Sequence, residues 1–145
     1  MNKIERFDGD FDFLSNFFPA DVRFEGILYP SSEAAFQAQK CFKNDDKLQF
    51  THLTPSQAKR LGRKIYLRPD WENIKVDMMT RIVRAKFTQH EVLGNLLYRT
   101  GESELIEGNT WNDTFWGVCN GVGENHLGKI LMQIRDELKE ARKNA

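Results

Sequence analysis

The stretch of residues 29–40 constrains this chain most, because it predicts where a helix begins and which side chains share one of its faces. Pro30 cannot extend a preceding strand pairing, and Ser31 or Ser32 can accept hydrogen bonds from the free amides of a first helical turn. Glu33 then falls in that turn, where the helix dipole favours a negative charge. We therefore predict that a helix begins near residue 32.

Three polar side chains share one face of this predicted helix. Glu33, Gln37 and Lys40 stand at positions i, i+4 and i+7. Phe36 lies beside them at i+3. One interpretation is the solvated side of an amphipathic helix. The other is a functional face, since neighbouring alanines allow close packing on several sides, and burial shifts the pKa values of carboxylates and amines.

The length and composition are those of one folded domain with a real core. The chain has 145 residues, of which 40% are hydrophobic and 29% charged, and it contains 11 Phe and 3 Trp. We predict a single α+β domain over residues 1–145, mostly helical, with a small antiparallel hairpin. The charged segment after about residue 138 is expected to be a frayed tail.

Charge and cysteine usage set the expected compartment and partners. Lys+Arg and Asp+Glu both total 21, so no overall field attracts nucleic acid or a membrane, and a local basic patch needs its own evidence. Cys41 and Cys119 lack the spacing of a disulfide framework or a zinc site. The chain shows no apolar leader and no run long enough to span a membrane. We expect a cytoplasmic protein; its oligomeric state is not predicted.

Local patterns predict the other elements. Glu25-Gly26 between two apolar triplets indicates a hairpin, and Thr54 to Gln57 is a capping box that opens a helix closed by Gly62. An apolar stripe follows Pro69-Asp70. The remaining predicted elements are a helix from Trp71 to about Phe87, a helix from about Glu91 to Tyr98, a strand at 105–107, and a final helix from Asn125.

Aromatic residues mixed with polar ones suggest binding surfaces. Residues 11–18 are predicted to form a loop packed on the core, and the residues alone favour a structural role for Asn16 in its turn. Trp71 and Lys75 stand at i and i+4, a pattern that also fits a packing contact with a solvated lysine. In the loop 109–123, Asp113 and Trp116 can project from one turn, or Asp113 can simply cap it.

Several common chemistries lack support. The three histidines fall in separate elements without metal-ligand spacing, and no Gly-x-Ser-x-Gly elbow is present. Residues 123–129 satisfy GxxxxGK, but Ile130 stands where a nucleotide triphosphatase needs Ser or Thr. The same glycine loop at a helix start can still bind a phosphate. We expect neither a metal nor an organic cofactor.

Four words in this order resemble the YbiA-like or NADAR family, over about residues 11–135. The words are Leu14-Ser15-Asn16-Phe17, the stretch Tyr29 to Lys40, Asp113-Thr114-Phe115-Trp116-Gly117, and Gly123 to Lys129. The resemblance implies the YbiA-like fold and an N-glycosidase acting on riboflavin-pathway intermediates or ADP-ribosylated guanine. It implies a pocket between the central helix, the Trp71 helix and the Asp113 loop. The implied catalytic residues are Glu33, Lys40 and Asp113, and the implied substrate-binding residues are Asn16, Phe17, Gln37, Trp71, Trp116, Gly117 and Asn125.

Carboxylates, an amine and aromatic plates suit cleavage of a bond between a sugar and a flat heterocycle. Loss of a base from ribose builds positive charge on C1′ and negative charge on the leaving nitrogen, which a carboxylate and an acid respectively stabilise. A desolvated Lys40 could instead attack C1′ and form a transient imine. The alternatives are a module that binds ADP-ribose or nucleotides without cleaving them, and an interaction protein with a vestigial pocket.

Overall fold

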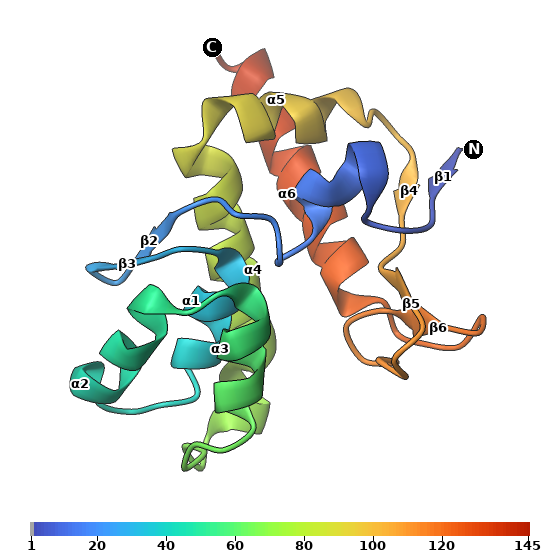
Figure 1. Cartoon of the computed structure of the whole chain (residues 1–145). Coiled ribbons are helices and arrows are strands. Elements are labelled where there is room, and N and C mark those ends of the chain that lie inside the picture. Colours follow the sequence, from blue (N-terminus) through green and yellow to red (C-terminus); the bar gives the residue numbers. More distant parts are fainter. Residues whose placement is uncertain (1) are drawn as a thin grey trace. The chain divides into compact units, whose positions relative to one another are not determined.

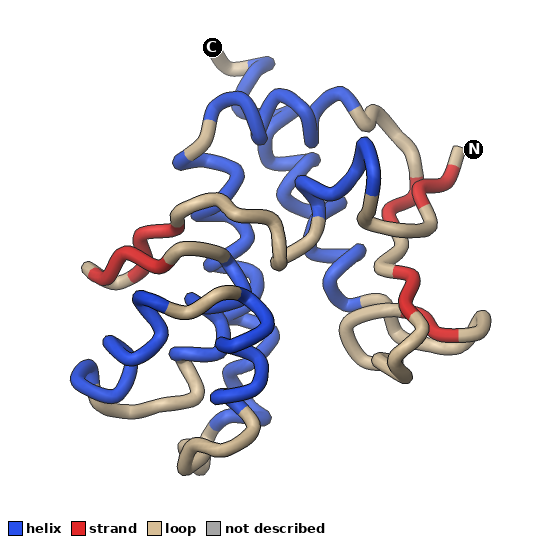
Figure 2. Tube along the Cα trace, in the orientation of Figure 1, coloured by secondary structure: helices blue, strands red, loops and turns tan. Residues whose placement is uncertain are grey.

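The computed structural model describes residues 2–145, and its backbone contacts gather into two compact units. The central unit is Asn16–Gln89, and the terminal unit combines the residues up to Ser15 with His90–Ala145. Helices dominate both units, and the strands are short pairs (Figures 1 and 2). The interpretation of residues 1–145 as a single domain stays a prediction. Each unit is described by itself below.

The central unit is built around helix α1 (Ser32–Ala38). It begins where the sequence predicts. Around it pack α3 (Pro55–Gly62), α4 (Trp71–Gln89) and the 3₁₀ helix η2 (Leu48–His52), which follows the single turn α2 (Asn44–Lys47). Tyr29, Phe50 and Ile82 are among its fully buried side chains. A helix buried on all sides thus forms the middle of this unit.

The predicted hairpin of the central unit is confirmed. Strands β2 (Val22–Phe24) and β3 (Ile27–Tyr29) pair in antiparallel register, with Val22 opposite Tyr29. Both turn residues have positive φ, Glu25 at 48° and Gly26 at 84°. Such a two-residue turn matches the right-handed twist of the strands. The predicted capping box is also present, since Thr54 accepts from the Gln57 amide and the Gln57 side chain accepts from the Thr54 amide.

The terminal unit contains helices α5 (Glu91–Arg99) and α6 (His126–Lys143), which pack on each other, and the 3₁₀ helix η1 (Gly9–Leu14). Two parallel pairs of two-residue strands complete it: β1 (Lys3–Ile4) with β4 (Glu104–Leu105), and β5 (Gly108–Asn109) with β6 (Val118–Cys119). Arg135 of α6 is buried and donates to Thr100 Oγ1 at 2.9 Å and to the Ser103 carbonyl at 2.8 Å.

Three details of the terminal segments differ from the sequence expectations. Part of the predicted loop 11–18 is helical, because η1 extends to Leu14. The strand expected at 105–107 is shorter and begins at Glu104. Helix α6 continues through the charged segment to Lys143, five residues beyond the point where fraying is expected, because its backbone hydrogen bonds need no apolar face.

Candidate active site

Helix α1 carries its polar side chains inside the protein. Ser31 is the N-cap, and its hydroxyl accepts from the Ala34 amide at 3.1 Å. All seven residues of the helix are buried, and Glu33 and Gln37 are only 8% and 6% exposed. The interpretation of this face as solvated is therefore wrong. A buried carboxylate needs a partner, and the structure supplies one.

Glu33 and Gln37 form a hydrogen-bonded pair one helical turn apart. The Gln37 Nε2 group donates to Glu33 Oε2 at 2.7 Å. The other end of the amide, Gln37 Oε1, has no hydrogen-bond partner among the described residues. It lies against Gly62 of α3, where an added Cβ would come within 2.0 Å of it. Glycine at this position allows α3 to pack tightly on the polar face of α1.

The turn before the hairpin fixes the start of α1. Ser32 Oγ donates to Asn16 Oδ1 at 2.9 Å, and the Glu33 amide donates to the Asn16 carbonyl at 3.1 Å. Asn16 Nδ2 in turn contacts Met79 Sδ of α4 at 3.3 Å. These contacts match the structural role that the residues alone favour for Asn16. Phe17 is 41% exposed, and Lys59 of α3 lies 5.9 Å from its ring centroid.

Lys40 lies just beyond the helix rather than on it. Helix α1 ends at Ala38 with Gln39 as its C-cap, so the i+7 helical position expected for Lys40 is wrong. The Lys40 amide still donates to the Gln37 carbonyl, which keeps the chain in a helix-like turn. Its Nζ donates to the Gly62 carbonyl at 3.4 Å. The amine therefore stays next to the α1–α3 contact.

The charge environment of Lys40 is that of a partly desolvated amine. Burial lowers the pKa of Lys40 below its usual range, and the nearby charges of Arg63 and Lys75 lower it further. The Glu33 carboxylate acts in the opposite direction. Lys40 and Glu33 are thus electrostatically coupled. A lysine with a lowered pKa has more of the neutral amine that nucleophilic catalysis requires.

An aromatic pair backs this region. Trp71, the first residue of α4, is 5% exposed, and its ring lies 5.1 Å from that of Phe36 at an interplanar angle of 53°. Lys75, one turn later, pairs with Glu72 at 2.5 Å. The sequence left two roles open for Trp71: packing against a neighbouring side chain, or stacking on a flat base of the substrate. The observed contact is packing against Phe36.

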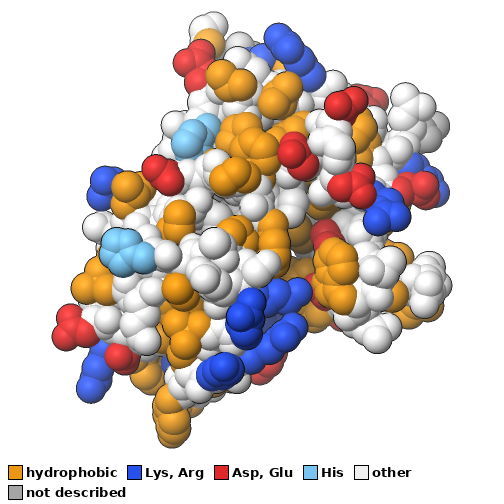
Figure 3. All heavy atoms as spheres, viewed as in Figure 1, with side chains coloured by type: hydrophobic (Ala, Val, Ile, Leu, Met, Phe, Trp, Pro, Cys, Tyr) orange, Lys and Arg blue, Asp and Glu red, His pale blue; other side chains and the backbone are white. Residues whose placement is uncertain are grey.

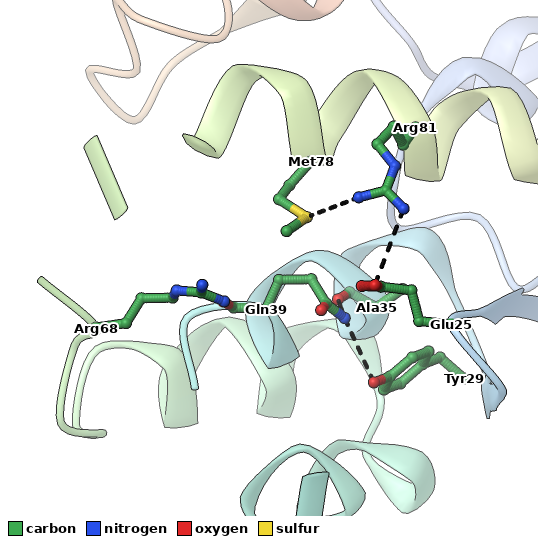
Figure 4. A network of polar contacts seen from close by, with 7 residues as sticks. All are labelled: Glu25, Tyr29, Ala35, Gln39, Arg68, Met78 and Arg81. Atoms are coloured by element: carbon green, nitrogen blue, oxygen red, sulfur yellow. Dashed lines mark hydrogen bonds and ion pairs between the residues drawn. The ribbon is translucent and has the colours of Figure 1, made fainter. Parts of the chain in front are cut away.

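Polar contacts hold the C-terminal end of α1 in place (Figure 4). Gln39 Nε2 donates to the Ala35 carbonyl at 2.9 Å and to the Tyr29 hydroxyl at 3.4 Å. Burial raises the pKa of Tyr29 to about 12, so this hydroxyl stays protonated at neutral pH. Arg68 Nη1 donates to the Gln39 carbonyl at 3.4 Å, and the Arg68 amide donates to the Lys40 carbonyl at 3.0 Å. The position of Lys40 is therefore fixed from both sides.

The Asp113 loop of the terminal unit is organised by carboxylate and amide caps. Asp113 Oδ1 accepts from the Phe115 amide at 3.2 Å and from the Trp116 amide at 2.9 Å. Asn109 Oδ1 accepts from the Asp113 amide at 3.1 Å, and Asn109 Nδ2 donates to the Asp113 carbonyl at 2.9 Å. The Trp116 ring packs edge-on against Phe115 and His126. Asp113 therefore caps its turn, which is one of the two roles that the sequence left open.

Gly117 and Asn125 are placed by close backbone packing. A Cβ on Gly117 would lie 1.8 Å from Glu107 Oε2 and 2.2 Å from the Glu107 carbonyl, so only glycine fits. Asn125 precedes α6 with a left-handed φ of 55°. Its Oδ1 accepts from the Glu107 amide and its Nδ2 donates to the Leu105 carbonyl, both at 2.9 Å. Both residues hold the strands next to this loop.

Comparison with known proteins identifies the family. The family model described as NADAR domain matches residues 5–139. The chain belongs to the NADAR domain family. The resemblance carried by the four sequence words is therefore confirmed.

Individual relatives agree with this assignment. A riboflavin biosynthesis protein of Vibrio vulnificus (strain YJ016) is 42% identical over 139 residues, covering 92% of this chain and 37% of that protein. The N-glycosidase YbiA of Shigella flexneri serotype 5b (strain 8401) is 38% identical over 133 residues, covering 89% of this chain and 82% of that protein. The NMR structure of the E. coli protein YbiA matches with a TM-score of 0.87 and 33% identity, covering 100% of this chain and 90% of that chain. The predicted α+β, mainly helical fold class is confirmed.

Within this NADAR chain, the predicted site residues lie in both units. Asn16, Phe17, Glu33, Gln37, Lys40 and Trp71 belong to the central unit, whereas Asp113, Trp116, Gly117 and Asn125 belong to the terminal unit. The sequence named Ser32 only as a possible cap of the first helical turn, and it did not single out Asn109. The spacing Asn109-x-x-x-Asp113 was a usable signal, because Asn side chains commonly bond to backbone a few residues away.

Among residues 2–145, no group of three or more His, Cys, Asp or Glu side chains could hold a metal ion. Nor does any helix within those residues have the length and apolar character needed to cross a membrane.

Proposed function

We propose that this NADAR chain is an N-glycosidase that hydrolyses the bond between a ribose and a nitrogen base. The names of its relatives support the reaction class, since one is an N-glycosidase and another a riboflavin biosynthesis protein. The observation that carries the proposal is the buried Glu33–Gln37 pair coupled to the partly desolvated amine of Lys40. These groups match the charges that develop when a base leaves ribose.

Glu33 acts on the sugar in this proposal. As C1′ loses the base it gains positive charge, which a carboxylate held in a low-dielectric site stabilises far more than one in water. Gln37 donates to one carboxylate oxygen at 2.7 Å and so fixes the direction in which the group points. Helix α1 holds both residues, which gives the site a rigid base.

Lys40 supplies the nucleophile. Opening of the sugar ring breaks the bond from C1′ to the ring oxygen, which takes the proton of the base nitrogen, and leaves C1′ joined to that nitrogen as an imine. The neutral amine of Lys40 adds to C1′ and passes one proton to the base nitrogen. The bond from C1′ to that nitrogen then breaks, and the base leaves with the electron pair and the second amine proton. The resulting imine between Nζ and C1′ is then hydrolysed by water, which releases the sugar and restores the amine. Burial favours this route because it lowers the pKa of Lys40, and the charges of Arg63 and Lys75 act in the same direction.

The remaining predicted residues bind the substrate or supply the second acid. The exposed ring of Phe17 can stack on a flat base, with Trp71 packed behind Phe36 as support. Asp113 stays the proposed second acid. Both hydrogen bonds of its carboxylate use Oδ1, so Oδ2 accepts none from the described residues. The binding roles of Trp116, Gly117 and Asn125 stay predictions.

The proposed substrates are nucleotide-like. A ribosylamino-pyrimidine phosphate suits the name of the Vibrio relative, and ADP-ribosylated guanine presents the same linkage between C1′ and a base nitrogen. Cys41 and Cys119 are free thiols, as is usual in a reducing compartment, so we propose that the enzyme acts in the cytoplasm. No metal or organic cofactor takes part in the proposed reaction.

The test is release of free base from each substrate, followed by chromatography. We expect turnover by the wild type and a loss of about 10² to 10⁴ in rate for Glu33→Gln, which removes the charge and little volume. Glu91→Gln makes the same change at an exposed position and should match the wild type. Tight binding of the substrate without any base release would show the non-catalytic alternative instead.

A further inference from the structure

A buried contact of the central unit joins a side-chain amide to a methionine sulfur. Charged side chains of both signs lie among apolar ones on the surface shown in Figure 3, whereas Asn16 and Met79 are only 7% and 3% exposed. Asn16 Nδ2 donates to Met79 Sδ at 3.3 Å. The two residues are 63 positions apart in the sequence, so the packing of α4 brings the sulfur to this turn. A buried amide therefore has a thioether as its acceptor.

The oxygen atoms of Asn16 face the start of α1. Asn16 Oδ1 accepts from Ser32 Oγ at 2.9 Å, and the Asn16 carbonyl accepts from the Glu33 amide at 3.1 Å. The Ser32 hydroxyl also lies 3.3 Å from that carbonyl. Asn16 thus links the sulfur on α4 to the end of α1 that carries the Glu33 carboxylate.

Ser32 does not by itself determine which way the Asn16 amide points. A hydroxyl can donate to Oδ1, and it can accept from Nδ2 if the amide is turned by half a rotation. A thioether sulfur accepts but does not donate. Nδ2 beside Met79 Sδ makes a hydrogen bond, whereas Oδ1 in that place would set two acceptors against each other. The sulfur therefore fixes the orientation of the amide.

The orientation of this amide determines where the Ser32 proton goes. In the observed orientation Ser32 donates in its shorter contact, to Asn16 Oδ1, and the Asn16 carbonyl is left to the Glu33 amide. In the reversed orientation Ser32 Oγ accepts from Nδ2, and its proton competes with the Glu33 amide for that carbonyl. The first turn of α1 then moves together with the Glu33 carboxylate. Catalytic groups tolerate displacements of only about 0.5 Å.

We propose that Met79 is a positioning residue for the glycosidase reaction: its sulfur orients the Asn16 amide, which holds the Glu33 end of α1. This role rests on the proposed function of Glu33. Met79 itself takes no part in making or breaking bonds. The competing role is packing alone, because methionine fills irregular gaps in protein cores.

Replacement by leucine and by glutamine separates the two roles. Met79→Leu nearly conserves the volume and removes the acceptor, whereas Met79→Gln keeps an acceptor oxygen and places a polar amide in a buried site. Packing alone makes leucine the milder change in both melting and base release. The positioning role predicts the opposite order for base release. The value of kcat/KM should fall about tenfold in Met79→Leu and less in Met79→Gln, although Met79→Gln melts at the lower temperature.

Met78 provides the matched control. Its sulfur accepts from Arg81 Nη1 at 3.7 Å (Figure 4), and its side chain is half-buried. Met78→Leu therefore removes the same atom from a neighbouring contact that does not involve Asn16. The kcat/KM of this variant should match that of the wild type.

The orientation of the Asn16 amide can be measured without activity, from nuclear Overhauser contacts of its side-chain protons in isotope-labelled protein. In the wild type these protons should contact the Met79 methyl group. In Met79→Leu the amide donor regains a partner by turning to Ser32 Oγ, so its protons should contact the Ser32 β-protons instead. This measurement does not require Met79→Gln to fold.

The two readouts separate failure of this proposal from failure of the proposed function. Base release that ranks Met79→Leu above Met79→Gln, or an Asn16 amide that keeps its wild-type orientation in Met79→Leu, would overturn the proposal. If the wild type releases no base from either substrate, the proposed function fails. A reversed amide in Met79→Leu would then still show that the sulfur orients Asn16.

Discussion

Glu33 and Asp113 are both carboxylates predicted to be catalytic, yet their surroundings differ. Glu33 is 8% exposed on a buried helix, and it accepts a hydrogen bond from the side-chain amide of Gln37. Asp113 is half-buried in a loop, and its carboxylate accepts from two backbone amides. The backbone partners make the Asp113 carboxylate part of its turn, whereas the Gln37 amide orients the Glu33 carboxylate. The helix region is therefore built as a site, and the loop region is first of all built as a turn.

The largest expected effect tests the helix region. Lys40→Ala should lower base release by about 10² to 10⁴, because the imine route has lost its nucleophile. Borohydride added during turnover should reduce the imine and leave the sugar on the wild-type chain, visible by mass spectrometry and absent from Lys40→Ala. Lys64→Ala, an exposed lysine near the same helix end, should retain both activity on a mononucleotide substrate and trapping. Wild-type turnover by Lys40→Ala would mean that the carboxylates alone carry the chemistry.

The second prediction asks whether the loop region does more than cap a turn. Asp113→Asn keeps an Oδ1 acceptor for the Phe115 and Trp116 amides, so thermal melting should change little. If Asp113 is the second acid, base release by this variant should still fall by about 10². Asp113→Ala also removes the cap. It should lower the free energy of unfolding by about 0.5 to 2 kcal/mol relative to Asp113→Asn.

The two variants separate chemistry from structure. Equal rates for wild type and Asp113→Asn, with only Asp113→Ala impaired, would reduce Asp113 to a structural residue. Melting curves and base release measured on the same samples decide the point.

Short-range sequence patterns predicted much of the structure around α1 and little of the structure around the Asp113 loop. The start of α1, the hairpin turn and the capping box follow from residues within four positions of one another. The parallel pairs β1–β4 and β5–β6 join distant residues through two-residue strands, which leave no periodicity to detect. Lys40 was predicted to lie on α1, but the helix ends two residues earlier, at Ala38, without a glycine or proline to mark its end.

The burial of Glu33 could not be predicted from the spacing of residues in the sequence either. An i, i+4 pattern of Glu33 and Gln37 is the same on a solvated helix and on a buried one. What decides between them is the approach of α3 at Gly62, a contact 25 residues away in sequence from Gln37. The burial of this polar face therefore depends on tertiary packing, and the periodicity of a single sequence carries no information about such packing.

The third prediction disturbs that packing. Gly62→Ala would place a Cβ 2.0 Å from Gln37 Oε1, so the amide must move and its bond to Glu33 weakens. The lost hydrogen bond costs about 0.5 to 1.5 kcal/mol, and alanine offsets about 1 kcal/mol of this through its helix preference. Melting should therefore change little while base release falls about tenfold, which corresponds to about 1.4 kcal/mol.

A double-mutant cycle provides the control for this change. In a Gln37→Ala background the clash is absent, so adding Gly62→Ala should not slow the enzyme further. Additive losses in the double variant would show that Gly62 acts through the backbone of α3 rather than through Gln37.

The smallest expected effect is the pH dependence that Lys40 gives to stability. Burial, Arg63 and Lys75 lower the pKa of Lys40 in the folded chain, and Glu33 opposes them without reversing the direction. Between that lowered pKa and the usual value of about 10.4 for lysine, the unfolded chain binds more protons than the folded one. The charged amine therefore costs stability below the window, and this cost disappears as pH rises through it. The melting temperature of the wild type minus that of Lys40→Gln should increase from pH 7 to pH 10.5, whereas the same difference for Lys64→Gln should stay flat. Tyr29, with its pKa near 12, is common to all three proteins and cancels in the subtraction. A difference that decreases with pH would mean that Glu33 stabilises the lysine cation, and Lys40 would then act by charge rather than as a nucleophile.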